Sequence, residues 1–327
     1  MSFYVIGGQQ KERRVDEWRQ YKKGMVVEVD GDDGRGKTCL EYVSPPEVCP
    51  DEDASIMFKA ASLEDDKLYL CTATEVLVYE APAFKRVAYV SLPCFNDLHH
   101  VCPTPEGNLL VASTGLDLVV EVDLEGRLVR EWSALDEDTW ARFSRDIDYR
   151  KVPTTKPHLA HPNYVFRVGE EVWTTRMMHK DAVCLTRPGA RVEIPGEGAH
   201  DGIMHGGFIF FTTIDGHVVV TNQKTLKTEE VIDLNAIKRG GDTDQPPPLG
   251  WARGLMVEAD GRIWVGFTRL RPTKFRENLS WIAHGFTNVH LPTRLALYDV
   301  YNKSLIKEID TEPFGVNAIF SIISRRD

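Results

Sequence analysis

A unit of four short apolar segments, which recurs along the chain, constrains the fold of this sequence most. The clearest copy opens at His99-His100-Val101 and turns at 105–108. It then continues through 109–111 and 118–123 and ends at 128–132. Short runs of Val, Ile, Leu and aromatic residues separated by Gly, Asp, Asn or Pro are typical of β-strands joined by tight turns. Regular recurrence of such a unit indicates a repeat architecture in which each copy forms one small sheet.

The number of copies and the two chain ends together predict a closed ring. Five complete copies occupy residues 54–92, 97–133, 161–196, 200–234 and 251–310, the first opening with a strand at 56–58. The C-terminal residues 315–327 supply one further strand and the N-terminal residues 3–43 supply three. Pairing these ends closes the ring and removes exposed sheet edges. We therefore predict an all-β, six-bladed β-propeller, a single domain over 1–327 whose last blade combines one C-terminal with three N-terminal strands.

Composition restricts the classes of partner. The chain has 327 residues, 42% of them hydrophobic, and a net charge of −10. This charge argues against binding to nucleic acid or to an anionic membrane, which require a clustered positive field. No apolar run is long enough to span a bilayer, and residues 1–14 lack the layout of a secretory signal. We expect a cytoplasmic protein with a small-molecule substrate and six reduced cysteines, since none has CxxC spacing.

Three sequence motifs resemble those of a known superfamily. Residues 252–255 followed by 259–265 (Ala-Asp-Gly-Arg-Ile-Trp-Val) look like the signature of NHL-type and SMP30/gluconolactonase-type propellers. His200-Asp201-Gly202-Ile203 and Pro162-Asn163 are similar to strand openings of the second type. The resemblance implies a fold that hosts lactonases, esterases, lyases and interaction modules, so activity must be argued from the site.

The innermost strands of a propeller line its central channel, and alternate residues of a strand face the same way. Aligning the strand openings predicts one polar ring, formed by Ser55, His99, Asn163, Asp201, Arg253 and Asn317. Two residues earlier, the same face carries Asp53, Asp97, His161, Ala199, Trp251 and Gly315. The three long insertions, 133–160, 235–250 and 269–293, are expected on the same rim. Long loops on one rim of a rigid scaffold commonly build a binding site.

Several of these side chains are suited to a divalent metal ion. His99, His161, His200 and Asp201, with Asn163 and Asp97 nearby, offer imidazole and carboxylate ligands that suit Zn, Fe or Mn. The gluconolactonase-type resemblance implies a calcium site of Glu, Asn and Asp oxygens, but the ring places His99 and Arg253 there, so calcium is less favoured. The alternative is that the histidines are hydrogen-bonding residues of the channel wall.

The strand register decides which histidines enter the channel. His100 and His200 have the opposite parity to His99 and His161, so they are expected to pack between blades unless a β-bulge brings them inward. Arg253 either pairs with Asp201 or clamps a carboxylate or phosphate. The insertion that contains His284 either forms a cationic and aromatic lid or is a solvated charged segment.

These features lead to a functional hypothesis with open alternatives. We predict a metal-dependent hydrolase or lyase that acts on a small anionic molecule at the mouth of the channel. The predicted catalytic residues are His99, His100, Asp201 and Arg253; the predicted substrate-binding residues are Ser55, Asn163, Arg253, Asn317, Trp251 and His284. The alternatives are a non-catalytic propeller that binds a metabolite or protein, an iron-dependent oxidative enzyme, and metal-free acid–base catalysis by His99 and Asp201.

Overall fold

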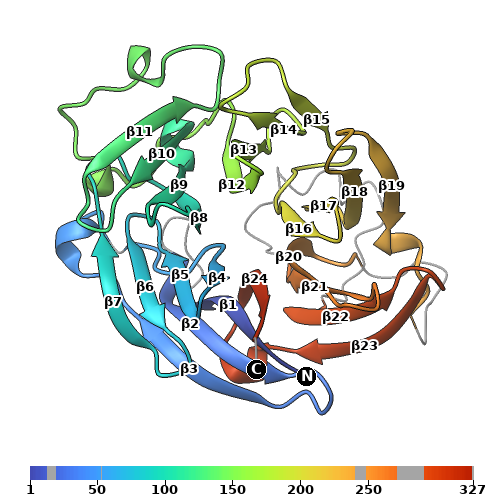
Figure 1. Cartoon of the computed structure of the whole chain (residues 1–327). Helices are drawn as coiled ribbons and strands as arrows, with labels where there is room; N and C mark the ends of the chain where they lie inside the picture. Colours follow the sequence, from blue (N-terminus) through green and yellow to red (C-terminus); the bar gives the residue numbers. More distant parts are fainter. Residues whose placement is uncertain (13–19, 53, 240–247, 271–290, 326–327) are drawn as a thin grey trace.

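Six four-stranded antiparallel sheets surround a central axis in the computed structural model, which describes residues 1–12, 20–52, 54–239, 248–270 and 291–325 (Figure 1). The innermost strands are β4 (Ser62–Glu64), β8 (Leu98–Pro103), β12 (Pro162–Val168), β16 (Ile203–His205), β20 (Trp251–Val257) and β24 (Ala318–Ser324). The second strands are β5 (Lys67–Cys71), β9 (Leu109–Ser113), β13 (Glu171–Arg176), β17 (Phe208–Thr213), β21 (Ile263–Thr268) and β1 (Ser2–Gln10).

The outer half of each blade follows the same order. The third strands are β6 (Val76–Glu80), β10 (Leu118–Val122), β14 (Asp181–Cys184), β18 (His217–Asn222), β22 (Arg294–Asp299) and β2 (Tyr21–Asp30). The outermost strands are β7 (Lys85–Val90), β11 (Leu128–Ser133), β15 (Arg191–Glu193), β19 (Thr228–Asp233), β23 (Ser304–Asp310) and β3 (Gly36–Tyr42). The described helical segments are short 3₁₀ turns such as Thr139–Ala141 and Tyr149–Lys151. The predicted six-bladed β-propeller is confirmed.

The last blade is built from both ends of the chain, as predicted. β24 pairs with β1 from Phe3 opposite Ser324 to Gly8 opposite Ala318, so the two ends lie beside each other. β1 then pairs with β2, and β2 with β3. Side chains of this sheet also pack on the neighbouring blade, where the rings of Phe3 and Trp264 lie 5.0 Å apart.

The opening strand of the first blade differs from the prediction. We expected it at 56–58, but β4 begins at Ser62. A two-residue turn at Asp65 and Asp66, both with positive φ, forces the β4–β5 hairpin to start close to residue 62. The predicted segment instead runs along the closing blade, since the Phe58 N–H donates to the Gly7 carbonyl oxygen.

Four of the six innermost strands, β8, β12, β20 and β24, have a one-residue register shift where they pair with the second strand, which the sequence pattern did not reveal. In β8 the shift lies between Leu98 and His100, and in β12 between Pro162 and Tyr164. β20 and β24 shift at the same level. The residues at these β-bulges are His99, Asn163, Arg253 with Gly254, and Phe320. Because a bulge interrupts the alternation of side chains, neighbouring residues enter different parts of the channel.

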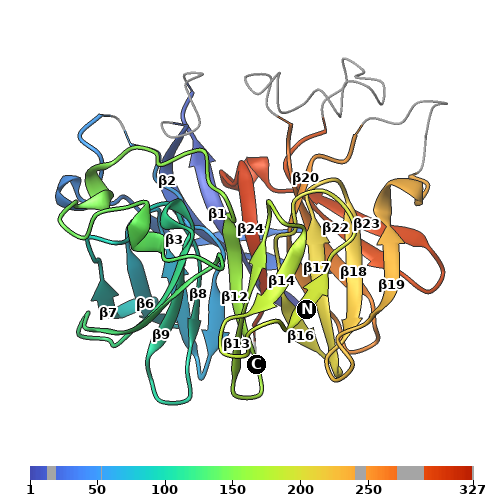
Figure 2. The same ribbon diagram turned by 90° about the horizontal axis from the view of Figure 1, so that it is seen from above.

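All six cysteines, at 39, 49, 71, 94, 102 and 184, are free thiols, as expected. Within the described ranges, no helix is long and apolar enough to cross a membrane. The insertion between β11 and β12 lies on the upper side of the ring in Figure 2.

A buried carboxylate joins the closing blade to the first blade. Glu75 is fully buried and accepts hydrogen bonds from Tyr42 Oη at 2.5 Å, Tyr89 Oη at 3.0 Å and Thr72 Oγ1 at 2.9 Å. Tyr42 ends β3, whereas the other three residues belong to the first blade. A buried carboxylate needs such donors because it has lost its hydration.

We expect Tyr42→Phe to lower the free energy of unfolding by roughly 1–3 kcal/mol, because the carboxylate loses a donor that water cannot replace. Urea denaturation would measure the change. Tyr301→Phe is the matched control, since that side chain is 81% exposed. A Tyr42→Phe variant as stable as the parent chain would contradict the role given to this contact.

Candidate functional site

Eight side chains meet where the innermost strands enter the channel, and we call this group the histidine cluster. Its members are Lys59, Asp97, His99, His158, His161, His200, Arg253 and Phe320. They come from all six blades, except that His158 belongs to the insertion between β11 and β12. His99, Arg253 and Phe320 occupy the bulges of β8, β20 and β24.

Phe320 lies at the centre of the cluster. Its ring centroid is 5.1 Å from Lys59 Nζ and 4.9 Å from the Arg253 guanidinium carbon. The imidazoles of His99 and His200 lie 6.5 and 6.0 Å from the same centroid. The π face of an aromatic ring attracts cations, so a buried phenylalanine helps to hold two positive charges in the channel.

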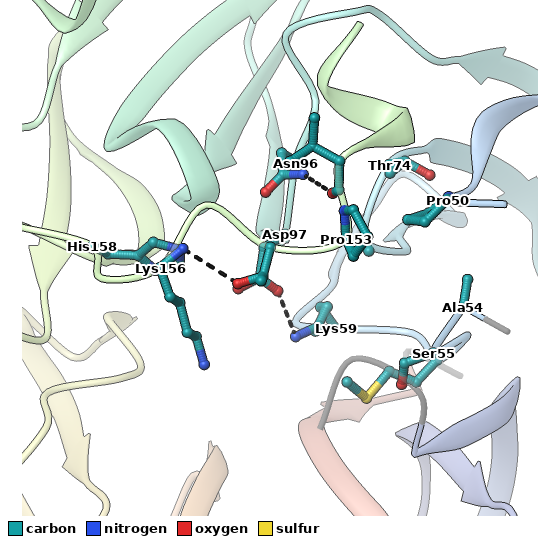
Figure 3. A pocket seen from close by; sticks show the side chains of 14 residues that line it. Pro50, Ala54, Ser55, Lys59, Thr74, Asn96, Asp97, Pro153, Lys156 and His158 are labelled. Atoms are coloured by element: carbon teal, nitrogen blue, oxygen red, sulfur yellow. Dashed lines mark hydrogen bonds and ion pairs between the residues drawn. The ribbon is translucent and has the colours of Figure 1, made fainter. Parts of the chain in front are cut away.

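Asp97 is the carboxylate that faces these cations. Lys59 Nζ is 3.2 Å from Asp97 Oδ1, and His99 Nδ1 is 3.8 Å from the same oxygen. Figure 3 shows Asp97 between Lys59 and His158. Burial opposes ionisation of Asp97, but the Lys59 ammonium and then the His99 imidazole hold its pKa well below the usual value. Asp97 is therefore ionised at neutral pH.

His99 is a neutral imidazole with a defined tautomer. Its Nδ1 lies 2.8 Å from the backbone carbonyl oxygen of Asp97, which only accepts hydrogen bonds, so Nδ1 carries the proton. Burial, followed by the charge of Lys59, lowers the pKa of His99 well below its usual value. The remaining nitrogen, Nε2, is therefore unprotonated and available as a base.

His161 lies beside His99, with 5.0 Å between the ring centroids. Its Nδ1 is 2.8 Å from Nδ1 of His158. Burial is the main cause that lowers the pKa of His161 and of His158. The cluster thus contains three adjacent imidazoles that are neutral at pH 7.

One carboxylate oxygen of Asp201 is engaged in hydrogen bonds within the protein. Its Oδ2 accepts hydrogen bonds from Thr212 Oγ1 and from the Gly254 N–H at 2.9 Å. Gly254 has φ +76°, and a Cβ there would lie 3.1 Å from the Ser321 backbone. The glycine of the Arg253-Gly254-Leu255 motif therefore permits the bulge and supplies this donor.

His200 is buried with its ring beside those of His99 and Phe320. Nδ1 is 3.5 Å from Asp201 Oδ1, and neither ring nitrogen has a hydrogen-bond partner within the part of the chain that is described. Burial lowers its pKa as well. A buried polar group without a partner is costly, so a bound water or ligand is the natural partner of this ring.

His100 has a different environment from His99. The Ser62 hydroxyl donates to the Val101 carbonyl oxygen, so His100 Nε2, at 3.1 Å from Ser62 Oγ, is the donor in that contact. The Val165 N–H donates to His100 Nδ1 at 3.3 Å, and the ring stacks on Tyr164. Burial lowers its pKa to about 3. The structure therefore engages both nitrogens of His100 and places it outside the histidine cluster.

The other predicted ligand-binding residues lie around the cluster. Asn163 is buried and its Nδ2 donates to the Ala199 carbonyl oxygen. Ser55 Oγ accepts the Tyr21 N–H, and Asn317 Oδ1 accepts the Gln10 N–H, so both bind backbone at the rim. Trp251 lies under Arg253, 5.3 Å from its guanidinium carbon. Asp53 and His284 lie outside the described residues.

A pocket of about 80 Å³ opens beside the cluster (Figure 3). Its wall includes Lys59, Asp97, Lys156 and His158, together with Ser55, which was predicted in the ring. The insertion between β11 and β12 supplies Lys156 and His158, so this insertion contributes to the site as expected.

The predicted metal ligands lie near one another, but they do not form a metal-binding arrangement as placed. Among the described residues, no group of three or more His, Cys, Asp or Glu side chains is placed to hold a metal ion. Asp201 Oδ2 is occupied by Thr212 and Gly254. These donors as placed do not fit a metal centre, and the divalent ion stays a prediction from sequence.

Sequence reasoning missed Lys59, His158 and Phe320. Lys59 interrupts the apolar run Phe58 to Ala61, and that lone charge is the signal that could have identified it. Phe320 belongs to an apolar strand and resembles an ordinary core residue, so no sequence signal marks it. His158 lies in an insertion whose path the pattern does not determine.

The fold is similar to those of several solved structures at low sequence identity. A protein of unknown function from Bacteroides caccae superposes with a TM-score of 0.63 and 11% identity, over 99% of this chain and 100% of its own. A streptogramin B lyase gives 0.48 and 11%, over 94% and 87%. Virginiamycin B lyase from Staphylococcus aureus gives 0.45 and 12%, over 94% and 88%.

No protein-family model matches the sequence, and no curated protein matches it. At these identities the structural likeness shows the six-bladed propeller fold alone. Membership of the NHL-type or SMP30/gluconolactonase-type group therefore stays a prediction.

Four buried histidines and the partly buried His161 predict a characteristic pH dependence of stability. The pKa values of His99, His100, His158, His161 and His200 are all lowered in the folded protein, mainly by burial. Below about pH 6.5 the unfolded chain binds protons that these rings cannot accept when folded. The free energy of unfolding should therefore fall as the pH decreases from 7.5 to 5.5, by up to about 1.4 kcal/mol per pH unit for each ring.

Urea denaturation at a series of pH values measures this slope. His99→Gln should reduce the slope, whereas His205→Gln, which changes an exposed residue at the end of β16, should leave it unchanged. An unfolding free energy that stays constant between pH 7.5 and 5.5 would show that these rings are not buried as neutral groups.

Proposed function

We propose that the protein is an enzyme that binds a small anionic molecule at the histidine cluster and removes a proton from it, as in a lyase-type elimination. His99 is the base, and Lys59 with Arg253 binds the negative charge of the ligand. The observation that carries this proposal is the neutral His99 imidazole, whose Nδ1 donates to the backbone carbonyl oxygen of Asp97. Two cations, Lys59 and Arg253, lie over the neighbouring Phe320 ring.

The charges around the pocket favour an anion. Lys59 and Arg253 flank Phe320, and Lys156 lies in the pocket wall. Asp97 is the carboxylate of the cluster; Asp201 and Asp117 lie beside it, and Asp117 is paired with Arg142. The imidazoles add no charge at neutral pH because burial lowers the pKa of each of them. A carboxylate or phosphate entering here gains charge-assisted hydrogen bonds in a site of low dielectric constant.

The chemical step follows from the tautomer of His99. Nε2 takes a proton from a carbon next to the carboxylate or carbonyl group of the ligand, and the ring becomes an imidazolium ion. Asp97 Oδ1, 3.8 Å from Nδ1, stabilises that ion. The electron pair left on carbon forms a double bond as the leaving group departs with its own bonding electrons. Lys59 and Arg253 stabilise the negative charge that develops on the ligand.

Replacing a cation at the cluster should weaken anion binding. Isothermal titration calorimetry with inorganic phosphate and with succinate measures it directly. Lys59→Met and Arg253→Met should each reduce affinity at least about tenfold, the cost of losing a charge-assisted hydrogen bond. Lys85→Met on β7, a change of the same charge on the outermost strand of the first blade, is the control. Equal affinities in all four proteins would contradict anion binding at this site.

Catalysis is tested separately from binding. A panel of small carboxylates with leaving groups is screened for alkene formation by absorbance, and the best compound is given to His99→Gln. We expect that variant to keep its affinity and to lose at least about a hundredfold in rate, because it has lost a general base. Binding without turnover of any compound would favour the non-catalytic propeller that binds a metabolite.

A further inference from the structure

A buried carboxylate holds the segment that carries His161 in place. Asp117 is fully buried with a left-handed backbone, and its Oδ1 accepts the N–H groups of Ala160 and His161 at 3.0 and 2.7 Å. Its Oδ2 accepts the Leu159 N–H at 2.9 Å and Arg142 Nη2 at 3.0 Å. Three successive backbone amides bound to one carboxylate fix this segment in space.

A chain of hydrogen bonds then determines which atoms of the segment carry protons. Asn96 Nδ2 donates to the carbonyl oxygens of Tyr149 and Val152, both at 2.8 Å, so its Oδ1 is an acceptor. Thr155 Oγ1 lies 3.4 Å from that oxygen and in short contact with the Gly115 carbonyl oxygen. Both neighbours only accept, so the single hydroxyl proton of Thr155 points to them.

The tautomers of the two histidines follow from this direction. His158 Nε2 is 3.3 Å from Thr155 Oγ1, whose own proton is used elsewhere, so His158 Nε2 carries the proton. A neutral His158 then has an unprotonated Nδ1. The 2.8 Å contact between the two Nδ1 atoms requires His161 Nδ1 to be the donor, which leaves His161 Nε2 unprotonated.

We propose that Thr155 and His158 are positioning residues that fix the tautomer of His161, so that His161 and His99 both present an unprotonated Nε2. The role in catalysis rests on the proposed function, but the tautomers themselves do not. The two rings belong to neighbouring blades and lie 5.0 Å apart. Two lone pairs repel a negatively charged oxygen, so the anionic group of the ligand turns to Lys59 and Arg253 while its acidic proton faces the imidazoles.

Nitrogen NMR of the ligand-free full-length protein tests the proposal. With ¹⁵N-labelled histidine, long-range ¹H–¹⁵N correlations distinguish protonated from unprotonated ring nitrogens, and His158→Gln and His161→Gln assign the signals. We expect His99 and His161 to be protonated at Nδ1 and His158 at Nε2. A proton on Nε2 of His161 in the parent protein would overturn the proposal.

Two substitutions at Thr155 separate positioning from folding. Thr155→Val removes the acceptor of the His158 proton and should shift the His158 and His161 nitrogen signals toward a mixture of tautomers. Thr155→Ser keeps the hydroxyl and should retain the parent signals. Unchanged tautomers in a folded Thr155→Val protein would overturn the role of Thr155. Because no ligand is added, failure here is distinct from a failure to bind phosphate or succinate.

Discussion

The one-residue bulge in the innermost strands is the constraint on which the candidate site depends. A bulge interrupts the strict alternation of a strand, so the residues beside it reach positions in the channel that regular alternation would not give them. The bulges of β8, β20 and β24 bring His99, Arg253 and Phe320 to one level. Gly254 supplies the backbone freedom at one of these bulges and binds Asp201.

The cost of burying two positive charges in the cluster is offset by neighbouring side chains. Placing Lys59 and Arg253 in a channel is costly unless each has compensation, and the Phe320 ring together with Asp97 provides it. The same burial keeps the imidazoles neutral, which is the state that a general base requires. The same electrostatics therefore determine both the positive charge offered to a ligand and the neutral state of the imidazoles.

The fold could be predicted from the sequence because each blade repeats the same strand and turn signals, and because the two ends together complete one blade. The predicted position of the first innermost strand was wrong. The apolar residues 56–58 resemble a strand, but the turn at Asp65 and Asp66 sets the register of the β4–β5 hairpin and places the strand further along the chain. Among the site residues, strand parity predicted that His99 and His100 would occupy different environments, and the contacts of the two rings agree with this. His200 has the same parity as His100 and was expected between blades, yet it lies beside His99 and Phe320. Asn317 was expected in the ring, but it binds the Gln10 N–H at the rim, and Phe320 of β24 reaches the cluster instead.

The central claim is that an anion binds among Lys59, Arg253 and the neutral imidazoles. Anomalous diffraction from crystals soaked in selenate, a heavier analogue of phosphate and sulfate, tests this most directly. The account predicts a selenium peak at the mouth of the channel, within hydrogen-bond distance of Lys59 or Arg253, that is lost in the Lys59→Met, Arg253→Met double variant. Selenate bound only elsewhere on the surface, or no peak at the cluster, would contradict it.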